Sequence, residues 1–317
     1  MLSVIDMNIV GNDFLYQRTS NFSVRRLEDR LIDYYGGFAK KLFLTGSGME
    51  AVTSTIEYLL PKTGKILIDK NLYVETRLWL RLVERYDVVQ TDMHDISSVR
   101  KCINGIDLVL LDNPNVFQQW FDAKEIARIC HEAGAKLVVD NSIVSFYYYN
   151  PLTDGADIVV ESYSKYISGH GDCMCGAIVF GYEPDNMARL DAFLGWRGRV
   201  VNPVTAYNLE KGLETLRVRM NRQETSAKYI INLLRKKGEN ILYCGHGGMF
   251  LDLGRTKKEA EKLKLFVVNL AYGFTYSMAT PSYNPDLYTG YGNYVRFSCG
   301  LEDKKELLRD IRQAFCL

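Results

Sequence analysis

The sequence predicts an α/β fold with a mostly parallel central sheet, followed by a smaller α+β unit. Short apolar segments recur through the first 180 residues, and segments with helical periodicity separate several of them. Strands of this kind are typical of a parallel sheet that helices cover on both faces. A long helical segment then precedes a shorter region that again mixes strand and helix patterns.

The expected elements follow one another in a regular order. Candidate strands of the central sheet are 41–45, 65–69, 87–91, 107–112, 136–140, 157–161 and 176–180, with helical patterns at 49–60, 75–85 and 123–133. Pro203 begins the long helical pattern, which continues to about Lys237. The smaller unit is expected to contain strands at 248–253, 266–270 and 294–298, a helix from about Lys257, and a closing helix at 302–315.

Composition predicts a soluble cytoplasmic protein. The 317 residues, 47% of them hydrophobic, are enough for a sizeable core and two structural units. A net charge of +1 argues against nucleic acid or an anionic membrane as a partner. The sequence shows neither a signal peptide nor an apolar run long enough to span a membrane. Its seven cysteines and four histidines form no metal-ligand pattern, so buried thiols are expected instead.

The strongest functional signal surrounds Lys165, which follows an apolar run in the segment V-V-E-S-Y-S-K-Y-I-S-G-H-G-D. A lysine at a strand end can bind pyridoxal 5'-phosphate (PLP) covalently, and the hydroxyls of Ser162 and Ser164 can bond its phosphate. Asn115 and Asp140 also lie just past predicted strands. Because ligands bind beyond the carboxyl ends of parallel strands, these residues are expected to converge on one crevice.

A second loop of small residues follows the first predicted strand. Ser47, Gly48 and Met49 stand where a helix is expected to begin. The unsatisfied backbone N–H groups and the dipole of a helix N-terminus favour an anion. These three residues are therefore candidate contacts of a phosphate.

Six motifs resemble, in the same order, those of the Cys/Met-metabolism family of PLP enzymes. The lysine segment is similar to S-x-T-K-Y-x-x-G-H-x-D, K-L-V-V-D-N-S to V-D-N-T, and L-L-D-N-P-N to E-x-P-x-N. T-G-S-G-M-E-A is similar to S-S-G-M-A-A, Y-V-E-T to Y-G-x-T, and Y-V-R-F-S-C-G-L-E-D to V-R-L-S-V-G-x-E. The chain is identified as a shortened member of this family, which implies fold type I, the aspartate aminotransferase fold.

The resemblance implies a role for each residue that matches a motif. Lys165 would bind PLP and move the α-proton of the substrate, and Asp140 would keep the pyridine nitrogen protonated. Tyr73 would stack on the ring, contact the substrate and pass a proton to the leaving group. Asn115 would bond the phenolic oxygen of the ring, and Arg296 would grip the substrate carboxylate with two donors.

The resemblance also implies an assembly with shared sites. Tyr16 and Arg18, in Y-Q-R-T-S-N, resemble a segment that reaches the phosphate of a neighbouring subunit. The expected unit is a homodimer, and pairing of dimers into a tetramer is the further alternative. The expected division is an N-terminal arm at 1–30 that reaches the neighbouring subunit, a PLP-binding domain at 31–202, a connecting helix at 203–238 and a small domain at 239–317.

The implied activity is β- or γ-elimination on a small sulfur-containing or γ-substituted L-amino acid. The alternative is γ-replacement, as in cystathionine or homocysteine synthases, followed by aminotransferase or racemase chemistry and then a non-enzymatic binding protein. Two departures concern the substrate. Glu75 stands where methionine γ-lyases usually carry a cysteine, and the segment 270–281 lacks the glutamate of members that handle cystathionine.

Overall fold

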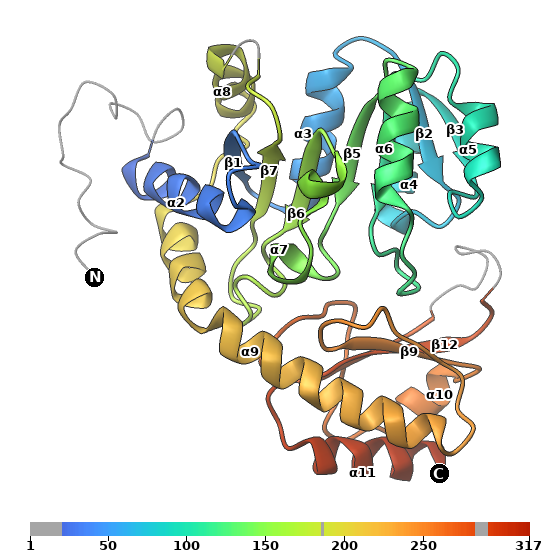
Figure 1. Ribbon diagram of the computed structural model, residues 1–317. Helices are drawn as coiled ribbons and strands as arrows, with labels where there is room; N and C mark the ends of the chain where they lie inside the picture. The colour runs from blue at the N-terminus through green and yellow to red at the C-terminus, as the bar shows by residue number, and fades with distance from the viewer. Residues whose placement is uncertain (1–20, 185–186, 283–290) are drawn as a thin grey trace.

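The computed structural model describes residues 21–184, 187–282 and 291–317, and these contain two sheets (Figure 1). Seven strands form the large sheet in the order β1-β7-β6-β5-β4-β2-β3. They are β1 (Lys41–Thr45), β2 (Lys65–Asp69), β3 (Asp87–Thr91), β4 (Leu108–Asp112), β5 (Lys136–Asp140), β6 (Ile158–Ser162) and β7 (Gly176–Phe180). The strands from β3 to β6 are parallel, whereas β7 is antiparallel to both β6 and β1.

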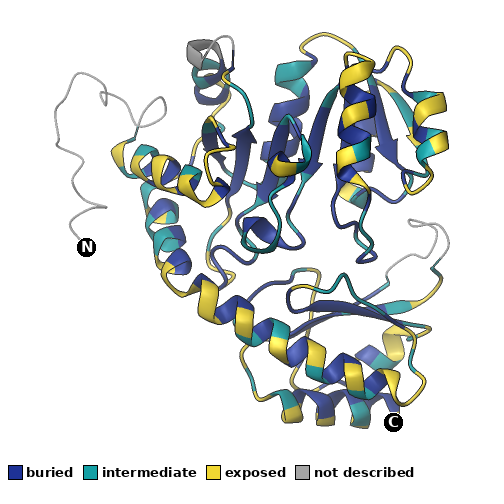
Figure 2. Cartoon of the chain, viewed as in Figure 1, coloured by how far each residue is buried: buried dark blue, intermediate teal, exposed yellow. Residues whose placement is uncertain are grey.

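Alternation along the strands gives the large sheet an apolar layer on each face. On β5, for example, Leu137 and Val139 belong to one cluster of buried residues and Val138 to the other. The helices that pack on one face are α2 (Phe22–Ile32), α5 (Ile96–Cys102), α6 (Ala123–Glu132) and part of α9 (Pro203–Arg235); α3 (Gly48–Leu59), α4 (Val74–Val83) and α8 (Met187–Trp196) pack on the other. The central strands are therefore buried on both sides, as Figure 2 shows.

The smaller sheet lies alongside the C-terminal half of α9 and has the order β10-β11-β12-β9-β8 (Figure 1). Its elements are β8 (Ile241–Leu242), β9 (Met249–Leu253), α10 (Lys257–Ala260), β10 (Val267–Val268), β11 (Met278–Pro281), β12 (Tyr294–Ser298) and α11 (Lys304–Phe315). The last turns of α9 and the apolar face of α11 cover it and form a third core. One long helix thus packs on both sheets.

The edge strand β1 is held to the large sheet by α2. The buried carboxylate of Glu28 accepts a hydrogen bond of 2.8 Å from the backbone N–H of Leu44. Arg25 in turn donates to the same carboxylate at 3.0 Å. Burial nevertheless raises the pKa of Glu28 to about 7. The helix therefore satisfies a backbone donor that an edge strand would otherwise expose to solvent.

The fold class predicted from the sequence is confirmed, as are most of the strands. Five of the seven predicted strands of the large sheet have the observed bounds, and the other two differ by one residue at one or both ends. The sequence patterns missed α2, α5, α8, β8, β11 and the short helix α7 (Ser145–Tyr148). The domain division stays a prediction. Within the described ranges, no helix has the length and apolar character that crossing a membrane requires.

A glycine allows α9 to approach the loop that follows β6. A Cβ atom added to Gly212 would overlap the carbonyl oxygen of Ile167 and lie 2.8 Å from that of Ser168. Further along the helix, the buried guanidinium of Arg219 donates to the carbonyls of Tyr166 at 2.7 Å and Ile167 at 3.1 Å. The loop is therefore fixed against the helix by steric fit and by hydrogen bonds.

This close approach predicts that Gly212→Ala destabilises the protein. Alanine would gain about 1 kcal/mol from its better helix propensity. Overpacking costs about 1–3 kcal/mol, and the upper part of that range applies because the obstacle is backbone. We expect a lower melting temperature in calorimetry, whereas the control Glu214→Ala, exposed on the same helix, should change it little. A melting temperature raised by Gly212→Ala would contradict the packing described.

Candidate active site

A cavity of about 400 Å³ lies at the carboxyl ends of the parallel strands, opposite the smaller sheet. Residues from β5, β6 and β12 and from the N-terminal ends of α3 and α4 line it. Nine of the residues predicted from the sequence contribute to this lining: Ser47, Gly48, Met49, Tyr73, Asp140, Ser162, Ser164, Lys165 and Arg296. The predicted convergence of separate motifs on one crevice therefore holds for the main parts of the site.

Lys165 lies in the tight turn that follows β6, where its backbone N–H donates to the carbonyl of Ser162 at 3.3 Å. Its amine stands 5.0 Å from the centre of the Tyr272 ring. Burial lowers the pKa of Lys165 from its usual value, and the positive charge of Arg296 lowers it further. Both effects favour the neutral amine, which is the nucleophilic form.

Two carboxyl groups lie side by side at the ends of neighbouring strands. Asp112 on β4 is in register with Asp140 on β5. Burial raises the pKa of both, and the charge of Asp140 raises that of Asp112 well above its usual range. Asp140 accepts a hydrogen bond from the backbone of Ser142 at 2.9 Å, and the nearby Lys165 favours its ionised form. Asp140 is therefore the group that ionises first.

The beginning of α3 lines one end of the cavity. The side chain of Ser47 caps the helix by accepting a bond of 3.0 Å from the N–H of Glu50. A Cβ atom on Gly48 would lie 2.7 Å from that of Ser162, so only glycine allows this serine so close to the helix. The hydroxyl of Ser164 is already bonded to the backbone of Cys175, at 2.8 and 3.1 Å.

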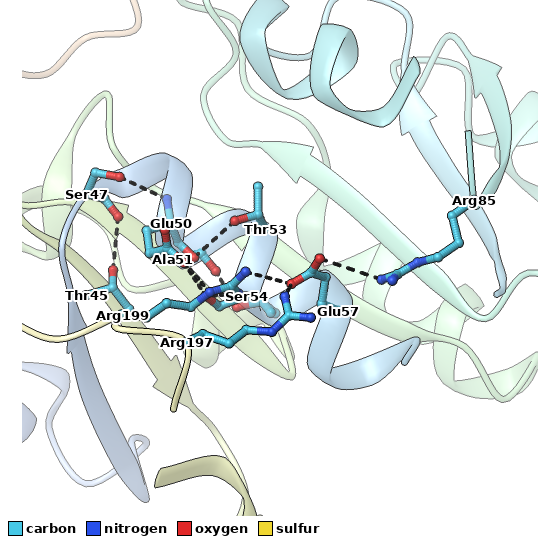
Figure 3. A network of polar contacts seen from close by, with 11 residues as sticks. Thr45, Ser47, Glu50, Ala51, Thr53, Ser54, Glu57, Arg85, Arg197 and Arg199 are labelled. Carbon is cyan, nitrogen blue, oxygen red and sulfur yellow. Dashed lines mark hydrogen bonds and ion pairs between the residues drawn. The ribbon is translucent and has the colours of Figure 1, made fainter. Parts of the chain in front are cut away.

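An ion-pair network fixes the side of α3 (Figure 3). The guanidinium of Arg199 contacts the carboxylates of Glu50 at 2.5 Å and Glu57 at 2.7 Å, and donates to Ser54 at 2.6 Å. Arg197 also pairs with Glu57. Because the network contacts α3 from its first turn to its last, it holds the helix that presents the donors of its N-terminus to the cavity.

Arg296 reaches the cavity from β12 in the smaller sheet. One of its nitrogens donates to the carbonyl of Leu270 at 2.6 Å and to the hydroxyl of Thr280 at 3.1 Å. The guanidinium carbon lies 5.1 Å from the centre of the Tyr272 ring. The buried Tyr272 ring therefore contacts both Arg296 and Lys165, each through a cation–π interaction.

Among the described residues, one predicted site residue, Asn115, does not line the cavity. Asn115 is buried in its own loop, where its side-chain oxygen accepts from the N–H groups of Phe117 at 3.0 Å and Gln119 at 3.1 Å. Val116 lines the cavity from this loop. The contact of Asn115 with a bound ring stays a prediction. Tyr16 and Arg18 lie outside the described residues.

The sequence motifs missed three residues that support the site. Asp112 accepts a hydrogen bond of 2.7 Å from the backbone N–H of Tyr73 and so places the start of α4. Tyr272 and Arg219 position the lysine and the loop after it. The dense tyrosines after residue 270 were a signal for Tyr272, but an arginine within a helical pattern carries none.

The cavity fits PLP. The N-terminus of α3, where Ser47, Gly48 and Met49 line the cavity beside Ser162, is where a phosphate would be held. Asp140 is a buried carboxyl that faces the cavity and would pair with a protonated ring nitrogen. Lys165 supplies an amine whose lowered pKa suits covalent binding to an aldehyde. Anion site, carboxylate and amine thus match the three polar ends of this cofactor.

Comparison with known proteins agrees with this fit. The L-methionine gamma-lyase of Pseudomonas putida is 31% identical, over 94% of this chain and 84% of its own length. The cystathionine gamma-synthase/O-acetylhomoserine (thiol)-lyase of Bacillus subtilis is 29% identical, over 96% and 86%. The crystal structure of metB from Corynebacterium glutamicum matches with a TM-score of 0.87 and 26% identity, over 95% and 86%.

A family model, described as Cys/Met metabolism PLP-dependent enzyme, matches residues 6–249. This match contains the N-terminus of α3, Asp140 and Lys165. It confirms the resemblance drawn from the six motifs and the PLP cofactor that they imply. The chain belongs to the Cys/Met metabolism family of PLP-dependent enzymes.

Proposed function

We propose that this enzyme eliminates the β- or γ-substituent of a small L-amino acid whose leaving group is attached through sulfur. The observation that carries the proposal is the position of Lys165 in one cavity with Tyr73 and Arg296. A base, a proton donor and a carboxylate receptor are the groups that such an elimination needs. The relative named as an L-methionine gamma-lyase supports the same chemistry.

The cofactor would be held at three places. The N-terminus of α3, with Ser47, Gly48 and Met49, and the hydroxyl of Ser162 would bind its phosphate. Asp140 would pair with the ring nitrogen. Asp112 supports this role because the two carboxyls do not ionise together, so the negative charge is on Asp140. When bound, PLP withdraws electrons from the α-carbon of the substrate.

The residues of this chain would orient the substrate and move its protons. Arg296 would bind the α-carboxylate, which places the α-hydrogen near Lys165. The amine of Lys165 would accept that proton. The hydroxyl of Tyr73 would donate a proton to the departing sulfur, so that a thiol leaves rather than a thiolate.

Replacement is the second candidate, and the Bacillus subtilis relative, named as a synthase and a thiol-lyase, favours it. The same residues would serve both reactions until the leaving group has departed. The two are separated by products. A panel of β- and γ-substituted amino acids, assayed with and without added thiol, yields a 2-oxo acid and ammonia on elimination and a new thioether on replacement.

Lys165 is expected to be the lysine that carries the cofactor. Borohydride reduction of the protein with PLP, followed by peptide mapping, should place the label on Lys165. Lys165→Ala should abolish covalent retention, whereas Lys136→Ala, a surface control in an ion pair with Asp157, should keep it. A label on another lysine, or on none, would contradict the assignment.

Arg296→Lys is expected to impair use of the substrate much more than binding of PLP. A lysine cannot reproduce the two parallel donors, and the lost contact costs about 2–4 kcal/mol, or roughly 30–1000-fold in kcat/KM. The measurements are kcat/KM for an amino-acid substrate and a titration of the protein with PLP. An equal loss in both would indicate that Arg296 supports the structure rather than the substrate.

We further propose a homodimer with shared sites, because Tyr16 and Arg18 resemble a segment that serves the phosphate of the adjacent subunit. Lys165→Ala and Arg18→Ala should each be inactive alone. Hybrids formed by dissociation and reassembly of the two should regain about one working site per dimer. A fully active monomer in sedimentation, or verified hybrids without activity, would refute shared sites.

A further inference from the structure

One acidic side chain in the cavity has no part in the proposed chemistry. Glu75 lies in the first turn of α4, two residues after Tyr73, and lines the cavity. Its charge acts on Lys165, since it raises the pKa of that amine against the effect of burial. Within the described ranges, the Glu75 carboxylate makes no hydrogen bond and no ion pair, and the residue is solvent-exposed.

The other charged groups of the lining already have partners in the proposed function. Arg296 is assigned to the α-carboxylate of the substrate, and burial lowers the pKa of Lys165, which favours its neutral amine. Asp140 is assigned to the ring nitrogen, and the pKa of Asp112 is raised well above its usual range. Glu75 is therefore the carboxylate of the lining that still lacks a cation when cofactor and α-carboxylate are bound.

The place of Glu75 on α4 relates it to the leaving group. Tyr73, the proposed proton donor to the departing sulfur, is at the N-terminus of the same helix. The side chains of Met174, Leu270 and Phe274 also line the cavity and offer apolar surface to methylene groups. A substrate whose sulfur reaches Tyr73 would therefore have its departing group in the cavity that Glu75 also lines.

We infer that Glu75 selects thioether amino acids whose departing thiol carries a positively charged amine. This inference rests on the proposed function and names its substrate class. The amine would pair with Glu75 while the α-carboxylate pairs with Arg296, so that both ends of the substrate are held by opposite charge. An apolar end group would instead leave the carboxylate with water alone.

A matched pair of substrates tests this selectivity. S-(2-aminoethyl)-L-homocysteine and S-propyl-L-homocysteine have nearly the same shape but differ in the charge at the end. The ratio of their kcat/KM values, measured as 2-oxobutanoate and ammonia released, should favour the amine in the wild-type enzyme. Glu75→Gln should lower that ratio by about tenfold. This effect is larger than the free energy of a fully exposed ion pair would give and smaller than that of a buried ion pair.

Two further variants separate this role from others. Glu75→Asp keeps the charge and should keep most of the preference. Glu84→Gln removes the same charge at the other end of α4 and should leave the ratio unchanged. A helix-stabilising role alone would lower the melting temperature of Glu75→Gln and lower both kcat/KM values equally. A ratio that is the same in wild type and Glu75→Gln overturns the inference.

Binding of ligands without a leaving group distinguishes this inference from the proposed function. L-lysine and L-2-aminoheptanoate differ in the same way as the two thioethers, and calorimetry gives their affinities for the PLP-bound enzyme. If neither thioether is cleaved but Glu75→Gln lowers the affinity for lysine relative to aminoheptanoate about tenfold, elimination is refuted and the role of Glu75 stands. If both thioethers are cleaved and neither ratio changes, elimination stands and the role of Glu75 is refuted.

Discussion

The architecture of the site depends on a buried cation that bonds to backbone. Arg219 is 2% exposed, and its guanidinium donates to the carbonyls of Tyr166, Ile167 and Gly212 and to the hydroxyl of Thr215. Burial alone lowers its pKa to about 10, so these bonds must compensate for desolvation. Because α9 also packs on the smaller sheet, the interaction connects the turn of Lys165 with the unit that carries Arg296.

Much of the fold could be predicted because most strands of the large sheet are buried on both faces and therefore appear in the sequence as short apolar runs. A segment such as 136–140 is apolar whichever way its side chains point, and its bounds are correct. The helix α2 was missed because its role depends on tertiary contacts: Glu28 becomes a buried acceptor only beside the edge of β1. The short strand β11 was missed because its residues read as part of a tyrosine-rich loop.

The site residues likewise include some that the sequence could predict and some that it could not. Asp140 could be predicted because it is the last residue of β5, where backbone geometry determines the direction of the side chain, and Lys165 because its segment matches a family motif. Asn115 lies three residues past its strand, and the loop there turns its amide inward while Val116 faces the cavity. Asp112 was missed since its part in the site is a bond to the backbone of Tyr73, which leaves no trace in a motif.

The ring of Tyr272 contacts both Lys165 and Arg296, so these two side chains lie near each other in the cavity. The charge of Arg296 therefore affects the pKa of Lys165. Burial lowers the pKa of Lys165, and as long as Arg296 is unpaired its charge lowers that pKa further. A carboxylate bound to Arg296 cancels that repulsion, so the pKa of the amine rises and the lysine becomes a stronger base. If Arg296 binds the substrate as proposed, the arrival of the carboxylate would make Lys165 a stronger proton acceptor than it was before.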